Sequence, residues 1–284
     1  MRVPVSADPF KITGPAIISF SGGRTSGYML WRILQAHGGK LPDDVVVTFA
    51  NTGREHWETL DFVMNCGVYW DVPIVWLEWR EGKPGFEVVE YGSHSKDGEP
   101  FAALIAKKKY LPNAVTRYCT VELKIRTIKK YAMSLGWKHW QSVIGLRYDE
   151  GHRVMKAIAS NEAGKERWKA VMPLSTGKVT KRDVMDFWGK QPFDLRLMGY
   201  QGNCDLCFLK KKTSRKQMIR DDKHVADWWI EQERTVGASR ASGNRFDLDV
   251  TVQQLKEDAV NQLNMFDFFD DEHDAECGLS CAAE

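Results

Sequence analysis

The first half of the chain alternates short, fully apolar runs with longer segments of helical periodicity. Three runs are apolar at nearly every position and are expected to be strands: residues 16–20, 45–50 and 74–79; residues 140–146 are expected to be another strand. Three segments carry apolar side chains at helical spacing: residues 26–37, 56–66 and 121–135. Strands without polar alternation, separated by helices, predict an α/β fold with an open, mostly parallel twisted sheet, helices on both faces and right-handed crossovers.

The pattern changes in the second half of the chain. Residues 82–116 are rich in glycine, lysine and polar residues and are expected to form a loop-rich excursion over the site. From Pro173 onward helices are predicted over residues 181–188, 213–232 and 252–266. We therefore expect an α/β part over residues 1–200, a helical part over residues 201–266, and a mobile acidic, cysteine-containing tail over residues 267–284.

Composition narrows the class of protein. The 284 residues suffice for one large α/β domain, and a net charge of +2 provides no global field for nucleic acid. The first fifteen residues contain no signal-like apolar run, and no stretch approaches the roughly 18 apolar residues of a membrane span. A soluble, cytoplasmic protein is expected. In that compartment the six cysteines indicate metal ligation or thiol chemistry rather than disulfides.

A phosphate-binding loop is predicted between the first strand and the first helix. Gly22 and Gly23 permit positive φ and a close approach of the backbone to phosphate oxygens. The first N–H groups of the following helix point at such an anion, at the sheet edge where open parallel sheets bind ligands. The residues expected to bind here are Ser19, Ser21, Gly22, Gly23, Arg24, Thr25 and Ser26. The alternative is a tight turn with an ordinary helix cap.

Three motifs together resemble a known family. Ser-Gly-Gly-Arg-Thr-Ser (residues 21–26) resembles the pyrophosphatase-type loop of the adenine nucleotide alpha-hydrolase superfamily. Asn-Thr-Gly at residues 51–53 resembles a segment of the phosphoadenosine phosphosulfate (PAPS) reductase family. Residues 145–150, with Arg153 beyond them, resemble the Gly-x-Arg-x-Asp-Glu element of that family. The motifs stand in family order and cover about residues 15–215.

The resemblance implies roles for these residues. Arg147 and Arg153 would contact phosphate or sulfate, and Asp149 and Glu150 would orient these arginines or bind Mg²⁺. A surface cluster of salt bridges is the alternative for these four. The other residues that would lie near the nucleotide are Asn51, Thr52, Gly53, Arg54 and Gly145.

Cysteines indicate sulfur or metal chemistry. Cys204 and Cys207 form a Cys-x-x-Cys, which by itself is typical of structural zinc, a redox pair or two buried thiols. Iron–sulfur-dependent sulfonucleotide reductases also carry an earlier Cys-Cys pair, of which only Cys119 is present here because Tyr118 replaces its partner. A three-cysteine [4Fe–4S] cluster similar to that of iron–sulfur tRNA thiolases is the leading expectation, with zinc and no metal as alternatives.

Two further features are candidates for function: the C-terminal tail and a run of basic residues. Residues 276–279 resemble the Glu-Cys-Gly-Leu tail of sulfonucleotide reductases. The resemblance implies that Cys277 is a nucleophile or a persulfide carrier. The alternative is a chemically inert chain end that contains both Cys277 and Cys281. Lysines 210–212 with Arg215 and Lys216 form either a solvated helix start or a site for a 3′-phosphate or nucleic-acid backbone. Cys66 is expected in the core, and Trp228 and Trp229 against the sheet.

Two reactions fit these features. In the first, ATP is cleaved to AMP and pyrophosphate to activate a tRNA base, a DNA base or a small molecule for thiolation, with sulfur from a donor protein or thiol. In the second, Cys277 attacks the sulfur of PAPS or adenosine phosphosulfate (APS), and sulfite is formed. The intact pyrophosphate loop favours the first reaction, and the tail motif favours the second. The oligomeric state has no signature in the sequence.

Overall fold

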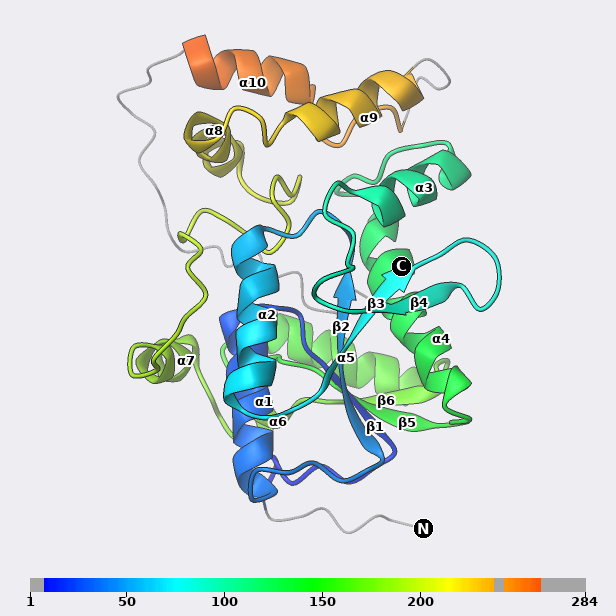
Figure 1. Ribbon diagram of the computed structural model, residues 1–284, viewed down its shortest axis with the longest axis vertical. Coiled ribbons are helices and arrows are strands. Elements are labelled where there is room, and N and C mark those ends of the chain that lie inside the picture. Colours follow the sequence, from blue (N-terminus) through cyan, green and yellow to red (C-terminus); the bar gives the residue numbers. More distant parts are fainter. Residues whose placement is uncertain (1–7, 238–242, 262–284) are drawn as a thin grey trace.

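The computed structural model describes residues 8–237 and 243–261. Its centre is a six-stranded sheet in the order β4-β3-β2-β1-β5-β6 (Figure 1). The strands are β1 (Ala16–Ser19), β2 (Val45–Asn51), β3 (Ile74–Trp79), β4 (Phe86–Val89), β5 (Trp140–Val143) and β6 (Trp168–Val171). All neighbouring pairs are parallel except β3 and β4, which are antiparallel. The predicted open, mostly parallel sheet is confirmed.

Apolar side chains leave both faces of the sheet, which explains the uninterrupted runs in the sequence. Ile18 of β1 packs in the larger core with α1 (Arg24–Ala36), α2 (Trp57–Tyr69) and α7 (Lys181–Trp188). Ile17, the preceding residue, packs on the opposite face with α4 (Thr127–Ser134) because neighbouring side chains of a strand point to opposite faces. The helix α5 (Gly151–Ala163) packs against β6 and the loop after β5 through a smaller cluster.

A second core holds the helical C-terminal portion together. It joins α3 (Glu99–Lys108), α8 (Lys212–Asp221), α9 (Asp227–Gly237) and α10 (Val252–Asn261), which Figure 1 shows beyond the carboxyl end of β2. Trp229 is its largest fully buried side chain, with ring centroids 5.9 Å from Phe101 and 4.7 Å from Phe246. The two neighbouring tryptophans therefore pack mainly among helices and loops, and the predicted packing of Trp228 and Trp229 against the sheet is wrong.

Several boundaries differ from the sequence prediction. The segment 213–232 forms two helices, because the chain leaves helical geometry at Asp222, whose carboxylate accepts a hydrogen bond from the His224 N–H. The excursion at residues 82–116 contains β4 and α3. Residues 121–135 begin as a π-helix, Thr120–Arg126, before α4. Neither β4 nor α3 was predicted, and neither were α5, β6 and the short α6 (Pro173–Thr176). The tail at 267–284 lies outside the described residues.

The exposed positions of α5 explain why its helical pattern was missed. Met155 and Ile158 are exposed on this helix, so its apolar residues do not form a single buried stripe. Within the described ranges, no helix is both long enough and apolar enough to cross a membrane.

The topology brings two predicted motifs together. β1 lies between β2 and β5, and the chain proceeds from β1 to β2 on one side and from β5 to β6 on the other. This reversal is the switch point at which open α/β sheets bind ligands beyond their carboxyl ends. The loops after β1 and β5 touch there: a Cβ added to Gly145 would lie 3.4 Å from the Ser26 Cα.

The close contact between α1 and α7 gives a test of this packing. A Cβ at Gly27 would lie 2.7 Å from the Trp188 ring, whose Nε1–H donates to the Arg24 carbonyl at 2.8 Å. We expect Gly27→Ala to lower the free energy of unfolding by ~1–2 kcal/mol, because overpacking exceeds the gain in helix propensity. Gly151→Ala, at a helical glycine with open space around it, is the control and should be neutral or stabilising in urea denaturation. Equal effects of the two substitutions would contradict this account.

Candidate functional site

The phosphate loop, residues 19–26, has the geometry of an anion-binding turn. Gly22 has φ +81°, and a Cβ there would lie 2.6 Å from Thr59 Cγ2 of α2, so both conformation and packing require glycine. Gly23 is extended (φ −99°) and caps α1 without a side-chain hydrogen bond. The positive φ is therefore needed at Gly22 alone, and the first N–H groups of α1 lack a side-chain cap in this loop.

Two predicted binding hydroxyls instead support the loop. The Ser26 hydroxyl donates to the Gly23 carbonyl at 2.9 Å and accepts from the Ser21 N–H at 3.2 Å. The Ser21 hydroxyl donates to the same Ser26 oxygen at 3.0 Å. Ser19 lines a small pocket on the α4 face together with Trp140 and Trp168. Among the hydroxyl-bearing residues of the loop, Thr25 lines the cavity that is described next.

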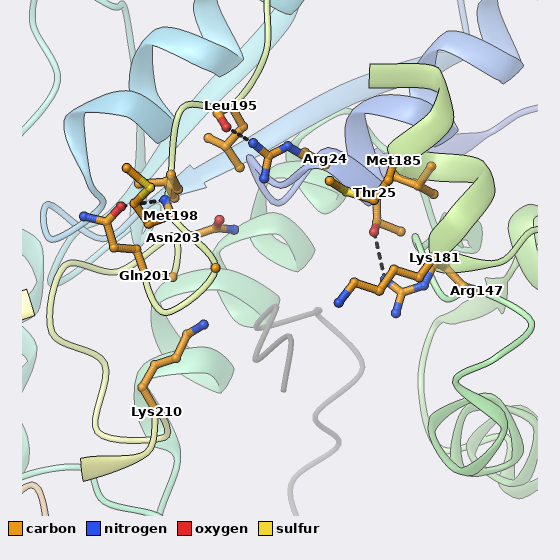
Figure 2. Close-up of a pocket in the computed structure, with 14 residues that line it drawn as sticks. Arg24, Thr25, Arg147, Lys181, Met185, Leu195, Met198, Gln201, Asn203 and Lys210 are labelled. Carbon is orange, nitrogen blue, oxygen red and sulfur yellow. Dashed lines mark hydrogen bonds between the residues drawn. The ribbon is translucent and has the colours of Figure 1, made fainter. Parts of the chain in front are cut away.

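A cavity of about 560 Å³, measured out to its open mouth, adjoins the loop. Four cationic residues from separate parts of the chain line it, counting described residues only: Arg24, Arg147, Lys181 and Lys210 (Figure 2). Residues 195–203 supply most of the opposite wall. Since no carboxylate is among the lining residues in the described ranges, the cavity has the charge of a site for a multiply charged anion.

Arg147 is the most strongly oriented of these cations. It is only 6% exposed, and its Nη1 donates to the Thr25 hydroxyl at 3.0 Å. Its Nε donates to Asp149 at 3.0 Å, and its backbone N–H donates to the Glu150 carboxylate at 2.9 Å. Asp149 also accepts the Lys181 N–H at 3.0 Å. The two acids therefore contact Arg147, which is itself buried beside the loop, whereas the Asp149 side chain is 38% exposed.

Arg153 lies further from the cavity. It pairs with the Glu150 carboxylate and is not among the residues that line the cavity. Its predicted contact with phosphate or sulfate stays a prediction.

Residues 51–54 form a buried network behind the site. The Asn51 amide donates to Glu78 at 2.6 Å and to the Ser95 carbonyl at 2.9 Å, and it accepts from the Gly53 N–H at 3.0 Å. Thr52 donates through its N–H and its hydroxyl to Glu55. None of these four residues lines the cavity, so their contact with a nucleotide stays a prediction.

Arg54 connects the α/β part to the helical part. Its guanidinium pairs with Asp205 and lies 5.1 Å from the centroid of the Trp228 ring. Asp205 also accepts the Trp229 Nε1–H at 3.0 Å. Burial raises the pKa of Asp205 to about 6, although the charge of Arg54 acts in the opposite direction. The role of Arg54 in this structure is to link the two parts.

Cys204 lies beside a buried ion pair. Cys204 forms a backbone bridge with Glu55, and its Sγ lies 4.0 Å from Glu55 Oε1. The same oxygen lies 3.1 Å from Lys124 Nζ, and both side chains are almost fully buried. Lys124 belongs to the π-helix that begins just after Cys119. Neither Glu55 nor Lys124 was singled out in the sequence.

The arrangement of possible ligands does not fit a metal centre. In residues 8–237 and 243–261, no three His, Cys, Asp or Glu side chains are grouped so that they could hold a metal ion. Cys119, Cys204 and Cys207 therefore do not fit the expected cluster as arranged. Mg²⁺ binding at Asp149 and Glu150 stays a prediction, because Mg²⁺ is commonly held by one or two carboxylates together with phosphate oxygens of the ligand. Cys66 is fully buried in the core as predicted, and burial raises the pKa of its thiol. Cys277 and Cys281 lie outside the described residues.

The basic run has a structural role that neither expectation covered. Lys212 pairs with Asp249 at 2.8 Å, Lys216 pairs with Asp258 at 3.4 Å, and the buried Arg215 pairs with Asp247. These ion pairs join α8 to residues 247–258. Lys210 differs from the rest of the run, because it is buried and lines the cavity.

Sequence reasoning missed three residues of the cavity region: Lys181, Asp194 and Asn203. A signal existed for the first, because Thr180 and Asp183 form a capping box that places Lys181 at the start of α7. Asp194 and Asn203 lie in an irregular segment without a motif, and both contact the phosphate loop. Such contacts between distant segments leave no local pattern.

The buried carboxylate of Glu78 gives a pH-dependent prediction. Burial acts to raise its pKa, but hydrogen bonds from Ser95, Arg80 and Asn51 outweigh it and lower the pKa. The ionised form therefore stabilises the fold above the unfolded-state pKa of about 4.3, and this stability is lost as the pH falls through the lower folded-state value. We expect Glu78→Gln to cost ~2–4 kcal/mol at pH 7.

Urea denaturation between pH 7 and pH 3 checks this, and the deficit of the variant should shrink toward acid. Glu87→Gln is the matched control, because Glu87 binds the same Arg80 at 2.7 Å but is exposed. Its effect should stay below ~1 kcal/mol. A pH-independent deficit for Glu78→Gln would count against an ionised carboxylate.

Comparison with known proteins finds similarity both in structure and in sequence. No protein-family model matches the chain. The U34-tRNA thiolase NcsA from Methanococcus maripaludis, solved with its [4Fe–4S] cluster, aligns with a TM-score of 0.39 and 14% identity over 95% of this chain and 77% of that one. A TM-score this low carries no assignment of function.

The second similarity is in sequence. The "uncharacterized nin region protein ORF290" of Escherichia phage lambda is 32% identical over 208 residues, which represent 70% of this chain and 67% of the phage protein. Identity at this level over two thirds of both proteins shows common descent. The chain therefore belongs to the family of the phage lambda nin region protein ORF290.

Proposed function

We propose that this protein is an adenine-nucleotide-binding enzyme of the PAPS-reductase-like type, which cleaves ATP to AMP and pyrophosphate in order to activate an acceptor for thiolation. The observation that carries the proposal is the cavity at the β1–β5 switch point, where the phosphate loop faces Arg147, Lys181 and Lys210. The resemblance of the loop to pyrophosphatase-type loops supplies the identity of the nucleotide.

Different groups of the cavity bind different parts of the triphosphate. The amides at the start of α1 bind phosphate oxygens, and the hydrogen bonds of Ser21 and Ser26 keep the loop in that shape before the ligand arrives. Arg147, held by Asp149 and Glu150, presents a planar donor to one phosphate. Lys181 and Lys210 add charge from two other sides of the cavity, which stabilises the negative charge that builds up on the departing pyrophosphate.

The reaction has two steps. An oxygen of the acceptor attacks the α-phosphorus of ATP, the bond to the β-phosphate oxygen breaks, and pyrophosphate leaves as the acceptor is adenylated. A donor then supplies sulfur as hydrosulfide, which attacks the activated carbon, AMP leaves with the oxygen, and loss of the S–H proton completes the thiolated product. The acceptor is a tRNA base, a DNA base or a small molecule. No step is assigned to an iron–sulfur cluster, because the described cysteines do not fit one.

The position of the Cys-x-x-Cys turn close to the phosphate loop supports its participation in the second step, the transfer of sulfur to the acceptor. The Asn203 amide, next to Cys204 in the chain, donates to the Ser21 carbonyl of the phosphate loop at 2.8 Å. Cys204 is thereby held near the loop that would bind the nucleotide.

Calorimetric titration with ATP tests the cations of the cavity. Lys210→Met and Lys181→Met should each weaken ATP binding about tenfold or more, since a charge-assisted contact contributes roughly 1.5–3 kcal/mol. Lys212→Met is the control, because Lys212 belongs to the same basic run but pairs with Asp249. Equal losses in Lys210→Met and Lys212→Met would exclude the proposed binding mode.

Product analysis tests the reaction itself. Incubation with ATP, a sulfur donor and candidate acceptors should release pyrophosphate and AMP in equal amounts. The same cavity has the charge to accept PAPS or APS, so these compounds are assayed in parallel for sulfite. Release of sulfite without pyrophosphate would replace the proposed reaction by sulfonucleotide reduction.

A further inference from the structure

The one arginine inside the phosphate loop is held by a carboxylate from elsewhere in the chain. Arg24 Nε donates to Asp194 Oδ1 at 2.8 Å, and Nη2 donates to Oδ2 at 2.7 Å. Nη2 also donates to the Leu195 carbonyl. Two parallel N–H···O bonds of this kind are the arrangement in which arginine binds a carboxylate or a phosphate equally well. Figure 2 shows Arg24 and Leu195 together at the edge of the cavity.

Asp194 begins a segment that forms one wall of the cavity. The segment 194–203 contributes Leu195, Leu197, Met198 and four further residues to the lining, and it ends directly before Cys204. It touches the phosphate loop at two points, through Asp194 with Arg24 at one end and through Asn203 with the Ser21 carbonyl at the other. Leu195 and Leu197 are buried in the core, whereas Met198 is 60% exposed.

We propose that Asp194 is a specificity-determining residue that competes with the phosphate tail of the ligand for Arg24. This inference rests on the proposed nucleotide site and adds to it a rule for which ligands bind fully: only a ligand that can displace Asp194 from Arg24. A ligand that carries a pyrophosphate group displaces the Asp194 carboxylate and takes its two hydrogen bonds. A ligand with a single phosphate binds the loop without reaching Arg24.

The energetics of the pair permit this exchange. The Arg24 and Asp194 side chains are 22% and 40% exposed, and ion pairs with that access to solvent are weak. A pyrophosphate group carries more charge than a carboxylate and also contacts the loop amides and the other cations. The exchange therefore favours the ligand, while part of its binding energy is used to displace Asp194.

Displacement also has a consequence for the wall of the cavity. Once Arg24 turns to the phosphate, the segment loses both its ion pair and the hydrogen bond at the Leu195 carbonyl. The backbone around Arg196, between the two buried leucines, then opens more often. Binding of the ligand and loosening of this segment are thus coupled in both directions.

Calorimetric titrations with pyrophosphate, ATP and AMP test the competition. Asp194→Asn should tighten the binding of pyrophosphate and ATP about five- to tenfold and leave the affinity for AMP within twofold. Asp186→Asn is the control for net charge, because Asp186 follows the cavity residue Met185 on α7 but pairs with Arg182. In the Arg24→Met background the effect of Asp194→Asn should vanish, since the contested guanidinium is gone.

The rate of limited tryptic cleavage after Arg196, measured by mass spectrometry, reports independently how often the segment 194–203 opens. Pyrophosphate should accelerate this cleavage in the unmodified protein, and Asp194→Asn should show the faster cleavage without ligand. Thermal melts establish that each variant is folded before it is titrated.

The outcomes separate this inference from the proposed function. If the unmodified protein binds neither ATP nor pyrophosphate, the nucleotide site fails and the competition fails with it. If it binds them and Asp194→Asn has no effect, or the same effect as Asp186→Asn, only the competition is overturned. A gain that persists in the Arg24→Met background likewise overturns it.

Discussion

The hydrogen bond from Arg147 to Thr25 joins the two loops on which the cavity depends. One loop follows β1 and the other follows β5, and 122 positions of chain separate the two residues. Because β1 and β5 are neighbours at the switch point of the sheet, their carboxyl ends emerge side by side. A buried guanidinium next to the phosphate loop requires partners, and Asp149 accepts its Nε–H while the Glu150 carboxylate accepts the backbone N–H of the same arginine. The cavity thus has an oriented positive charge without a carboxylate among its lining residues.

The second core places the remaining cations and the Cys-x-x-Cys turn. Trp229 packs between Phe101 and Phe246, and its Nε1–H donates to Asp205 of the turn. Asp205 in turn pairs with Arg54, which follows β2. Ion pairs between α8 and residues 247–258 hold the same helical portion, and Lys210, just before α8, lines the cavity. The helical portion therefore acts on the site through packing, even though it contributes few residues to it.

Carboxylates near the site have different roles that their positions in the sequence did not reveal. Asp149 and Glu150 orient Arg147, and Glu55 holds Lys124 beside Cys204. Asp194, in contrast, neutralises Arg24 through a pair that remains accessible to solvent. The difference in exposure decides which of these carboxylates a ligand can displace.

Local patterns were sufficient for the sheet and for part of the site. The apolar runs predicted β1, β2, β3 and β5 to within a few residues, because burial on both faces imposes a composition that can be recognised in a short window. The pair of glycines after β1 correctly marked the turn that requires a positive φ at Gly22. The Asp-Glu pair after Arg147 was also correctly associated with the orientation of that arginine.

Only the tertiary structure decided which cations share the cavity. Lys181 and Lys210 come to the cavity from separate parts of the chain, and Asp194 and Asn203 contact the phosphate loop across long distances in the sequence. The sequence also placed Ser19 at the nucleotide, whereas strand alternation directs Ser19 to the opposite face of the sheet. The contact of residues 51–54 with a nucleotide stays a prediction, and in this structure Asn51 takes part in buried hydrogen bonds. Side-chain direction and long-range pairing are set by the packing of whole elements, which no short window of sequence contains.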